Sequence, residues 1–233
     1  MNLRLLSASI FLVALVSVAL AAAEPKWISL FDGKTLQGWK QLDGQAKFEV
    51  REGTIVGIVT ESARQNSFLV TEDDSFVDFI FEAEFRCDLG INSGVQFRSR
   101  PADEKVKRVY GYQYEIDPTP RALTGGVQEE GGYGRRGPDN WLAPDQSSGP
   151  ARDEWVKKHG DPFKPREWNQ LRIEARGTRI KTWLNGHLLA DFDDNDDIRI
   201  RRGFFGLQVH STKDAKLFGR EVAFRKLRVQ RLD

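Results

Sequence analysis

The feature that most constrains the fold of this chain is a succession of short segments in which apolar and polar residues alternate. Such alternation places one kind of side chain on each face of a β-strand. Clusters of Gly, Asp and Asn separate the segments, and no long stretch beyond residue 23 keeps the period of an amphipathic helix. We expect strands at 48–50, 54–59, 77–86, 94–98, 110–116, 168–174, 180–184, 187–192, 204–210 and 221–229.

This density of strands predicts an all-β fold. Roughly ten strands in about 200 residues are typical of a sandwich of two antiparallel sheets or of a barrel. Asn185-Gly186, between two strand segments, indicates a tight hairpin, because both central residues of a type I′ turn need positive φ. No internal repeat or linker interrupts residues 24–233, so we expect them to form one domain.

Residues 1–23 have a different character. They contain one basic residue, Arg4, no acidic residue, and an apolar run that ends in three alanines at 21–23. This layout is typical of a secretory signal peptide. The alternatives are a membrane anchor and a buried helix, but the apolar run is short for a helix that spans a membrane. We expect cleavage after Ala23 and a secreted or periplasmic protein that is not attached to a membrane.

Charge and cysteine content exclude other classes. The 233 residues include 35 Lys plus Arg and 34 Asp plus Glu, and this balance argues against a nucleic-acid partner, since phosphate binding needs a basic surplus. Cys87 is the only cysteine, so no intramolecular disulfide can form. Its position in a strand segment predicts a small core residue. The sequence does not indicate an oligomeric state.

A long segment, 131–165, breaks the sequence of strands. It holds five of the nine prolines and two tryptophans, Trp141 and Trp155. A loop of this length within a compact domain is usually functional or disordered, and the tryptophans favour an ordered lid or rim. We expect one helical turn at 153–158.

Several strand segments set an apolar face against a face of acids, amides, arginine and histidine. The polar faces carry Glu84, Gln96, Arg98, Gln113, Glu115, Asp117, Gln208 and His210. A half-buried sheet with one face in water explains any single strand. These faces have almost no lysine and consist of acids, bidentate donors and one imidazole. If the strands are neighbours, such residues favour a concave polar surface suited to a sugar or a metal.

Seven motifs run in order over almost all of residues 24–233. They are LFDGKTLQGW at 30–39, NSGVQFR at 92–98, GYQYEID at 111–117, WNQLRI at 168–173, WLNG at 183–186, GLQVH at 206–210 and FRKLRV at 224–229. In this set the chain resembles the 3-keto-disaccharide hydrolase domain family. The resemblance implies a concanavalin A-like β-jelly-roll and a carbohydrate substrate already oxidised at C3.

The implied reaction is an elimination. A 3-keto group acidifies the C2–H, so a base can remove that proton while the glycosidic oxygen leaves C1, and water can then add to give net hydrolysis. Such a site needs a base, an acid and an electrophile, which a divalent metal ion can supply. The resemblance makes His210 the first candidate for base or metal ligand, and Glu115 and Glu84 candidate acids or ligands.

Other residues are then expected to bind the substrate. Amide and guanidinium groups on the polar faces would contact hydroxyls or the enolate oxygen, and residues at a strand end and in the loops would reach the site from its rim. These candidates are Gln96, Arg98, Gln113, Gln208, Asp117, Glu130, Tyr133 and Trp141. The site hypothesis requires Glu84, Arg98, Glu115 and His210 to converge beneath the 131–165 segment.

Two departures from the family pattern bear on the site. Many relatives have Glu and then Gln in the G-Y-E-x-Q-I strand, whereas here Gln113 precedes Glu115; Ser211 replaces the small Gly usual after the final His. We therefore leave the metal open. The alternative function is a noncatalytic carbohydrate-binding module, which would bind through exposed aromatics such as Trp141 and Trp155, since fold alone does not decide function.

Overall fold

The computed structural model describes residues 26–61, 65–101, 108–131, 140–196 and 200–232. Within these ranges the chain forms fifteen strands, one α-helix and a short 3₁₀ turn at Ala215–Leu217. The strands and the helix are β1 (Trp27–Ser29), β2 (Trp39–Leu42), β3 (Lys47–Arg51), β4 (Thr54–Ile58), β5 (Ser67–Thr71), β6 (Phe79–Cys87), β7 (Ser93–Pro101), β8 (Val109–Ile116), β9 (Val127–Glu130), β10 (Trp141–Ala143), α1 (Gly149–His159), β11 (Asn169–Arg176), β12 (Arg179–Leu184), β13 (His187–Asp193), β14 (Phe204–Val209) and β15 (Glu221–Arg231).

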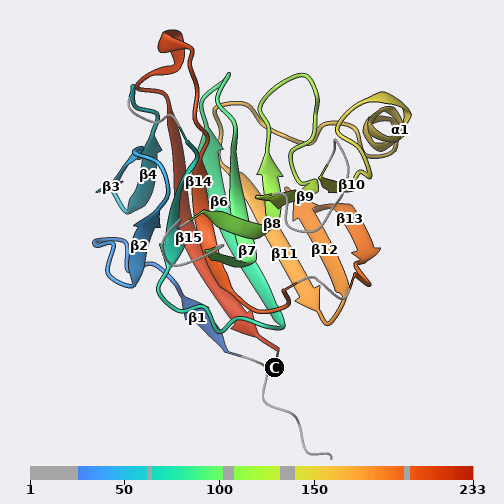
Figure 1. Ribbon diagram of the computed structural model, residues 1–233, viewed down its shortest axis with the longest axis horizontal. Helices are drawn as coiled ribbons and strands as arrows, with labels where there is room; N and C mark the ends of the chain where they lie inside the picture. Colours follow the sequence, from blue (N-terminus) through green and yellow to red (C-terminus); the bar gives the residue numbers. More distant parts are fainter. Residues whose placement is uncertain (1–25, 62–64, 102–107, 132–139, 197–199, 233) are drawn as a thin grey trace, which may run out of the picture.

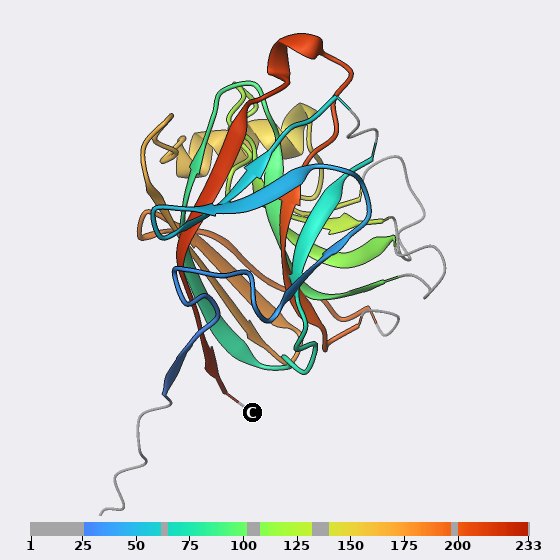
Figure 2. The same ribbon diagram turned by 90° about the vertical axis from the view of Figure 1, so that its left-hand side faces the viewer.

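These strands form two antiparallel sheets (Figure 1). Sheet A has the order β13-β12-β11-β6-β15-β4-β3, with β1 also paired to β15. Sheet B has the order β10-β9-β8-β7-β14-β5-β2. Neighbours in a sheet are mostly distant in the sequence, and Figure 2 shows the sheets as two layers, so the fold is a jelly-roll-like sandwich.

The core lies between the layers and is rich in phenylalanine. Phe205 of sheet B lies 4.7 Å from Phe79 and 4.4 Å from Phe81 of sheet A, measured between ring centroids. All three side chains are fully buried. Such aromatic contacts bury a large apolar area, so this row of rings holds one sheet against the other.

The structure confirms the all-β, two-sheet prediction, and each of the ten expected segments is a strand. At the β12–β13 hairpin, Asn185 and Gly186 have φ of 50° and 82°, as the turn requires. Cys87 is 1% exposed and lies in the core, also as expected. The sequence did not reveal β1, β2, β5, β9 and β10. Four of these have three or four residues, too few to show an alternating pattern, and β5 is buried along its whole length, so it does not alternate.

The 131–165 segment contains more structure than the single turn predicted. It includes β10 and the eleven-residue helix α1, which starts with a proline in its first turn and ends at Gly160 with φ of 64°. In Figure 1 the helix lies beside β10 and β13. Trp155 of α1 and Trp141 of β10 are only 8% and 4% exposed, so they are not the exposed aromatics that the alternative, a noncatalytic binding module, would use.

The predicted signal peptide lies outside the described residues. In the part of the chain that the structure describes, no helix has the length and apolar character needed to cross a membrane.

Candidate functional site

Three of the strands predicted to carry polar faces, β7, β8 and β14, are neighbours in sheet B, with β9 beyond β8. Gln113 of β8 lies opposite Gln96 of β7 on one side and Gln128 of β9 on the other. Paired residues point to the same face of a sheet, so these three amides form a row. The next residue on that face of β8 is Glu115.

A directional chain of hydrogen bonds leads from this row to Glu115. The Ser99 hydroxyl donates to Gln96 Oε1 (2.8 Å), Gln96 Nε2 donates to Gln113 Oε1 (2.6 Å), and Gln113 Nε2 donates to Glu115 Oε2 (3.1 Å). Gln128 Nε2 donates to the same Glu115 oxygen across 2.7 Å. The amides therefore have their donors turned toward one carboxylate, and each bond polarises the next.

The second oxygen of Glu115 faces the end of the sheet. Asn92 Nδ2, in the segment before β7, donates to Glu115 Oε1 across 2.5 Å, and Arg121 Nη2 lies 4.0 Å from the same oxygen. The Arg121 side chain is 48% exposed, whereas that of Glu115 is 2% exposed. The partly exposed Arg121 side chain thus lies on the solvent side of the buried carboxyl.

Two opposing effects set the pKa of Glu115. Burial disfavours the charged form and raises the pKa to about 7, while the donated hydrogen bonds from Asn92 and Gln113 act in the lowering direction. Asp117 raises the pKa through its charge and Arg121 lowers it. A carboxyl group with a pKa near neutrality can both hold and release a proton at physiological pH.

Gly94 makes room for this arrangement. It lies opposite Glu115 in the β7–β8 pair, and a Cβ at this position would lie 2.5 Å from Gln113 Cδ. The Gln113 side chain therefore crosses directly over the Gly94 backbone, a close approach that only glycine permits.

A second carboxylate, Glu130, lies on the same side of sheet B. Its oxygens accept hydrogen bonds from Gln208 Nε2 (3.0 Å) and Asn66 Nδ2 (3.5 Å). β7 and β8 separate the strands of Glu130 and Gln208, so sheet B must curl strongly to bring them together. Burial raises the pKa of Glu130. Gln208 Oε1 is buried and has no hydrogen-bond partner among the described residues.

His210 lies at the same end of the sheet as Glu115. Val209, the residue before His210, pairs with Ser93 of β7, which pairs on its other side with Ile116, the residue after Glu115. The His210 side chain is exposed, with Nδ1 2.7 Å from the Ser211 carbonyl oxygen. A cavity of about 540 Å³ lies directly beyond it, lined by Glu61, Ser211, Thr212, Lys213 and Phe218.

Arg98 is not part of this polar face. Its φ is 47°, a register shift follows in the β7–β8 pairing, and the side chain is fully buried. Its guanidinium donates to the carbonyls of Val77 (2.8 Å) and Gly177 (2.7 Å) and to Asp78 Oδ1 (2.9 Å). The bulge turns Arg98 toward sheet A, where it connects the two layers, so its predicted convergence with Glu115 is wrong.

Glu84 is also elsewhere. β6 belongs to sheet A, so the expectation that its polar face joins those of β7, β8 and β14 is wrong. Alternation within a strand reveals its two faces but not the sheet to which the strand belongs. The Glu84 carboxylate instead contacts Arg225 (2.6 Å) and Lys226 (2.7 Å) on the outer face of sheet A.

The remaining predicted residues have separate positions. Asp117 is buried just after β8, where its carboxylate accepts from the backbone N–H of Thr119 and pairs with Arg121 (2.9 Å). It shares Arg121 with Glu115 and shapes the end of the site. Trp141 is buried in the core cluster. Tyr133 lies outside the described residues.

The site residues that the sequence reasoning missed are Asn92, Gln128, Arg121 and Asn66; Arg121 lies in a loop after β8 and had no pattern to reveal it. Gln128 alternates with Glu130 in a short polar run, and Asn92 begins the NSGVQFR motif, so both had a signal. Asn66 comes just before β5, a strand that the sequence did not predict, so no sequence signal pointed to Asn66.

Metal binding was left open, and the described side chains give it no support. Among them no group of three or more His, Cys, Asp or Glu residues is placed to hold a metal ion. The amide-rich surroundings of Glu115 suit hydroxyl and carbonyl oxygens better than a cation. We derive no step through a metal.

The comparisons with known proteins agree with this all-β architecture. The model of the 3-keto-alpha-glucoside-1,2-lyase-like domain family matches residues 26–230. The chain therefore belongs to this family, as the motifs indicated. The comparison with curated proteins returns no match.

Several solved structures have a similar fold. A putative glycosyl hydrolase from Parabacteroides distasonis superposes with a TM-score of 0.56 and 19% identity, covering 89% of this chain and 94% of that one. A Bacillus subtilis protein of unknown function with a galectin-like fold gives 0.59 and 9%, covering 84% and 90%. The VIP36 exoplasmic/lumenal domain bound to Ca²⁺ and Man3GlcNAc gives 0.53 and 10%, covering 90% and 91%. At these identities the likeness shows the fold, and the family supports a carbohydrate-related function.

Proposed function

We propose that this protein cleaves 3-keto-glycosides, including 3-keto-disaccharides, at the polar end of sheet B. The observation that carries the proposal is the chain of amide donors directed at one buried carboxyl, that of Glu115, whose pKa is raised to about 7. An ordinary solvated sheet face has no need of a carboxyl group kept out of water and held near neutrality.

In the proposed reaction, His210 removes the proton from C2, next to the 3-keto group. The electron pair of the C2–H bond forms the C1=C2 double bond, the C1–O bond breaks, and Glu115 gives its proton to the departing glycosidic oxygen. Addition of water across C1=C2 then yields the free 3-keto sugar, for net hydrolysis. Arg121, which is 48% exposed, would move aside for the substrate to reach Glu115.

The amides supply recognition. Gln208 Oε1 has an unused acceptor among the described residues and faces the same side of the sheet as Glu130. A buried acceptor without a partner is costly, and a sugar hydroxyl would satisfy it. The side-chain oxygen and nitrogen of Gln96 and of Gln113 are both used in the chain of hydrogen bonds, so these two residues act by positioning Glu115.

The family supports this reading, since its description refers to a 1,2-lyase acting on 3-keto-alpha-glucosides. We also propose that the protein works outside the cytoplasm, in the periplasm or secreted, on the basis of the expected signal peptide at residues 1–23.

The test is to incubate the purified protein with a 3-keto-disaccharide and, separately, with its unoxidised parent, and to follow the released sugar by chromatography. Release from the keto substrate alone is expected, and the His210→Ala variant should lose most of it. No release from either compound, with and without added divalent metal ions, would overturn the enzyme proposal. Binding of the unoxidised sugar without turnover would favour the noncatalytic carbohydrate-binding module.

A further inference from the structure

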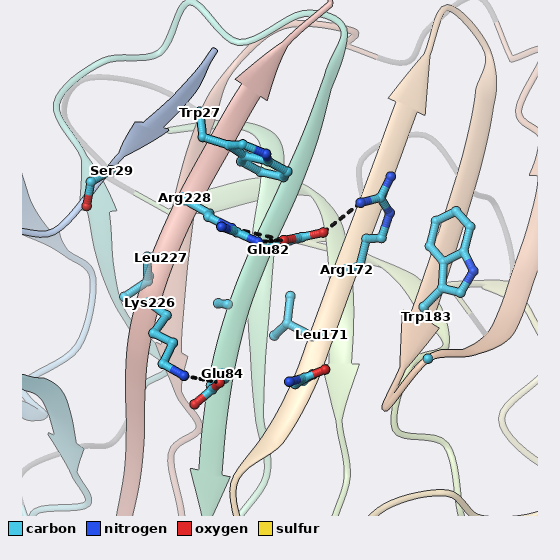
Figure 3. Close-up of a pocket in the computed structure, with 13 residues that line it drawn as sticks. Trp27, Ser29, Glu82, Glu84, Leu171, Arg172, Trp183, Lys226, Leu227 and Arg228 are labelled. Carbon is cyan, nitrogen blue, oxygen red and sulfur yellow. Dashed lines mark hydrogen bonds and ion pairs between the residues drawn. The ribbon is translucent and has the colours of Figure 1, made fainter. Parts of the chain in front are cut away.

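A separate groove of about 780 Å³ runs along the outer face of sheet A, on the side of the sandwich away from Glu115. Figure 3 shows Trp27 at one end, Trp183 at the other, and charged side chains between them. The residues lining it are Trp27, Ser29, Glu82, Ala83, Glu84, Gln170, Leu171, Arg172, Trp183, Gly186, Lys226, Leu227 and Arg228. Its volume is in the range of ligand pockets.

The floor of the groove is a row of residues in register across five strands. Ser29 of β1 pairs with Arg228 of β15, Arg228 with Glu82 of β6, Glu82 with Arg172 of β11, and Arg172 with Trp183 of β12. Four inter-strand steps make this row about 19 Å long. The groove therefore suits an extended ligand.

The charged groups in the groove leave donors, and not acceptors, free for a ligand. Glu82 accepts from Arg172 Nη1 on one oxygen (2.6 Å) and from Arg228 on the other (2.6 and 3.0 Å). Glu84 is bound in the same way by Arg225 and Lys226. Every carboxylate oxygen in the floor is thus paired with a cation. Arg172 also pairs through Nη2 with Glu174 (3.5 Å), but a guanidinium has five N–H donors, so Arg172 and Arg228 keep donors for a ligand. The occupant must supply acceptors.

The pairing of Glu84 with Arg225 and Lys226 depends on an unusual backbone conformation. Lys226 has φ of 53°, and the β15–β6 register shifts between Arg225 and Arg228. This bulge brings the consecutive residues Arg225 and Lys226 to the same carboxylate, although alternation would send them to opposite faces. A non-glycine residue in this conformation costs about 1 kcal/mol or more. The bulge also returns the next residue, Leu227, to the core, where it is 1% exposed, so it serves packing as well as this ion pair.

Tryptophan distribution points to the same surface. Trp39, Trp141 and Trp155 are buried, and the three partly exposed tryptophans, Trp27, Trp168 and Trp183, all contact arginines of this face. The guanidinium carbon of Arg228 lies 4.3 Å from the Trp27 ring centre, that of Arg172 lies 5.4 Å from Trp183, and that of Arg225 lies 3.9 Å from Trp168. Each ring thus packs against an arginine, and Trp168 also lies 5.1 Å from the guanidinium carbon of Arg86.

We propose that this groove binds an acidic oligosaccharide, with sugar rings against Trp27 and Trp183 and a uronic-acid carboxylate on Arg172 or Arg228. Rigid aromatic rings give apolar area for the sugar faces, and guanidinium groups bind carboxylates in a bidentate geometry. The groove is distinct from the proposed catalytic end of sheet B, so it would hold the protein on an acidic glycan while the other sheet acts. This inference does not depend on the proposed reaction.

The test is titration of the whole protein with a galacturonic acid trisaccharide and with neutral maltotriose, followed by calorimetry and tryptophan fluorescence. We expect the acidic trisaccharide to bind at least tenfold more tightly than the neutral one, with affinity that falls as salt rises. Trp183→Ala and Arg228→Met should each weaken binding at least tenfold. Ile28→Ala is the matched control, since Ile28 is 45% exposed and adjoins Trp27 on β1 but does not line the groove.

Equal binding of the two trisaccharides, binding of neither, or unchanged binding by both groove variants would overturn the proposal. Cleavage of a 3-keto-disaccharide is measured in parallel and should be unchanged by Trp183→Ala. If that variant loses cleavage while the trisaccharide still binds, the groove is the catalytic site and the inference is wrong. Failure of the wild-type protein to cleave the keto substrate overturns only the proposed function.

Discussion

The side-chain amide of Gln128 donates to Oε2 of Glu115 across 2.7 Å, from a strand that pairs beside that of the carboxylate. The partner atoms of both Glu115 oxygens given by the structure are nitrogen donors, from Asn92, Gln113, Gln128 and Arg121. Donors favour the ionised form and burial favours the protonated form, so the carboxyl is held between the two states. Such a balance is what proton transfer at neutral pH requires.

Glu115→Gln should lower kcat for a 3-keto-disaccharide by about 10²–10⁴-fold, because glutamine keeps the volume but cannot give up a proton to the leaving oxygen. The measurement is initial rate of sugar release, with circular dichroism to verify folding. Glu49→Gln on β3, at the surface of sheet A, is the control and should retain the wild-type rate. A Glu115→Gln protein with full activity would remove Glu115 from the proposed mechanism.

Folding stability should depend on pH through Glu115. Its pKa is raised to about 7 in the folded state from 4.5, so the folded protein holds this proton more tightly than the unfolded chain. The stabilisation is complete below pH 4.5 and is lost as the pH rises through about 7, an effect on the order of 3 kcal/mol. Urea unfolding at several pH values should show this loss in the wild type and not in Glu115→Gln. Parallel curves for the two proteins would contradict the raised pKa.

Activity should fall as the pH rises through about 7, since Glu115 must be protonated to act as the acid. The relevant measurement is kcat/KM between pH 5 and 9, which reports the ionisation of the free enzyme. If kcat/KM instead rises through pH 7 and stays high, Glu115 is the base. His210 would then be the acid.

Much of the fold followed from local patterns. The β12–β13 hairpin was visible in Asn185-Gly186, because its turn has a specific backbone requirement. The amide row was visible in part, since Gln96, Gln113 and Glu115 alternate with apolar residues that lie in the core. The reversed order of Gln113 and Glu115 keeps both on one face, two residues apart, where the structure joins them by a hydrogen bond.

The pairing between strands was not predictable from such patterns. Glu84 and Glu115 have similar surroundings in sequence, yet their strands belong to different sheets. Arg98 follows Gln96 in perfect alternation, and only its bulged backbone reverses its direction. A tryptophan in a long proline-rich segment favours a position at a rim, but β10 pairs with β9 and Trp141 is buried. In each case a long-range contact outweighs the local signal.

Arg98→Met should destabilise the protein by about 1–3 kcal/mol, because the carbonyls of Val77 and Gly177 lose a donor and Asp78 keeps only the Gly177 N–H. Chemical denaturation measures this loss. Because Arg98 connects the sheets and does not face the site, the fraction that remains folded should keep the wild-type KM. A stable variant with a strongly raised KM would show that Arg98 binds substrate after all.

Gly94→Ala should disturb the site through Gln113 and not through any contact of its own with substrate. The added methyl would lie 2.5 Å from Gln113 Cδ, so the amide must move and its bond to Glu115 Oε2 is lost. Loss of this donor raises the pKa of Glu115 further, because the bond favours the ionised form. The pH above which activity falls should therefore move upward, with kcat lower by about tenfold. Gln113→Ala removes the same donor without crowding and should give the same upward displacement of the pH profile. If Gly94→Ala lowers activity while its pH profile stays that of the wild type and Gln113→Ala has no effect, the hydrogen-bond chain does not position Glu115.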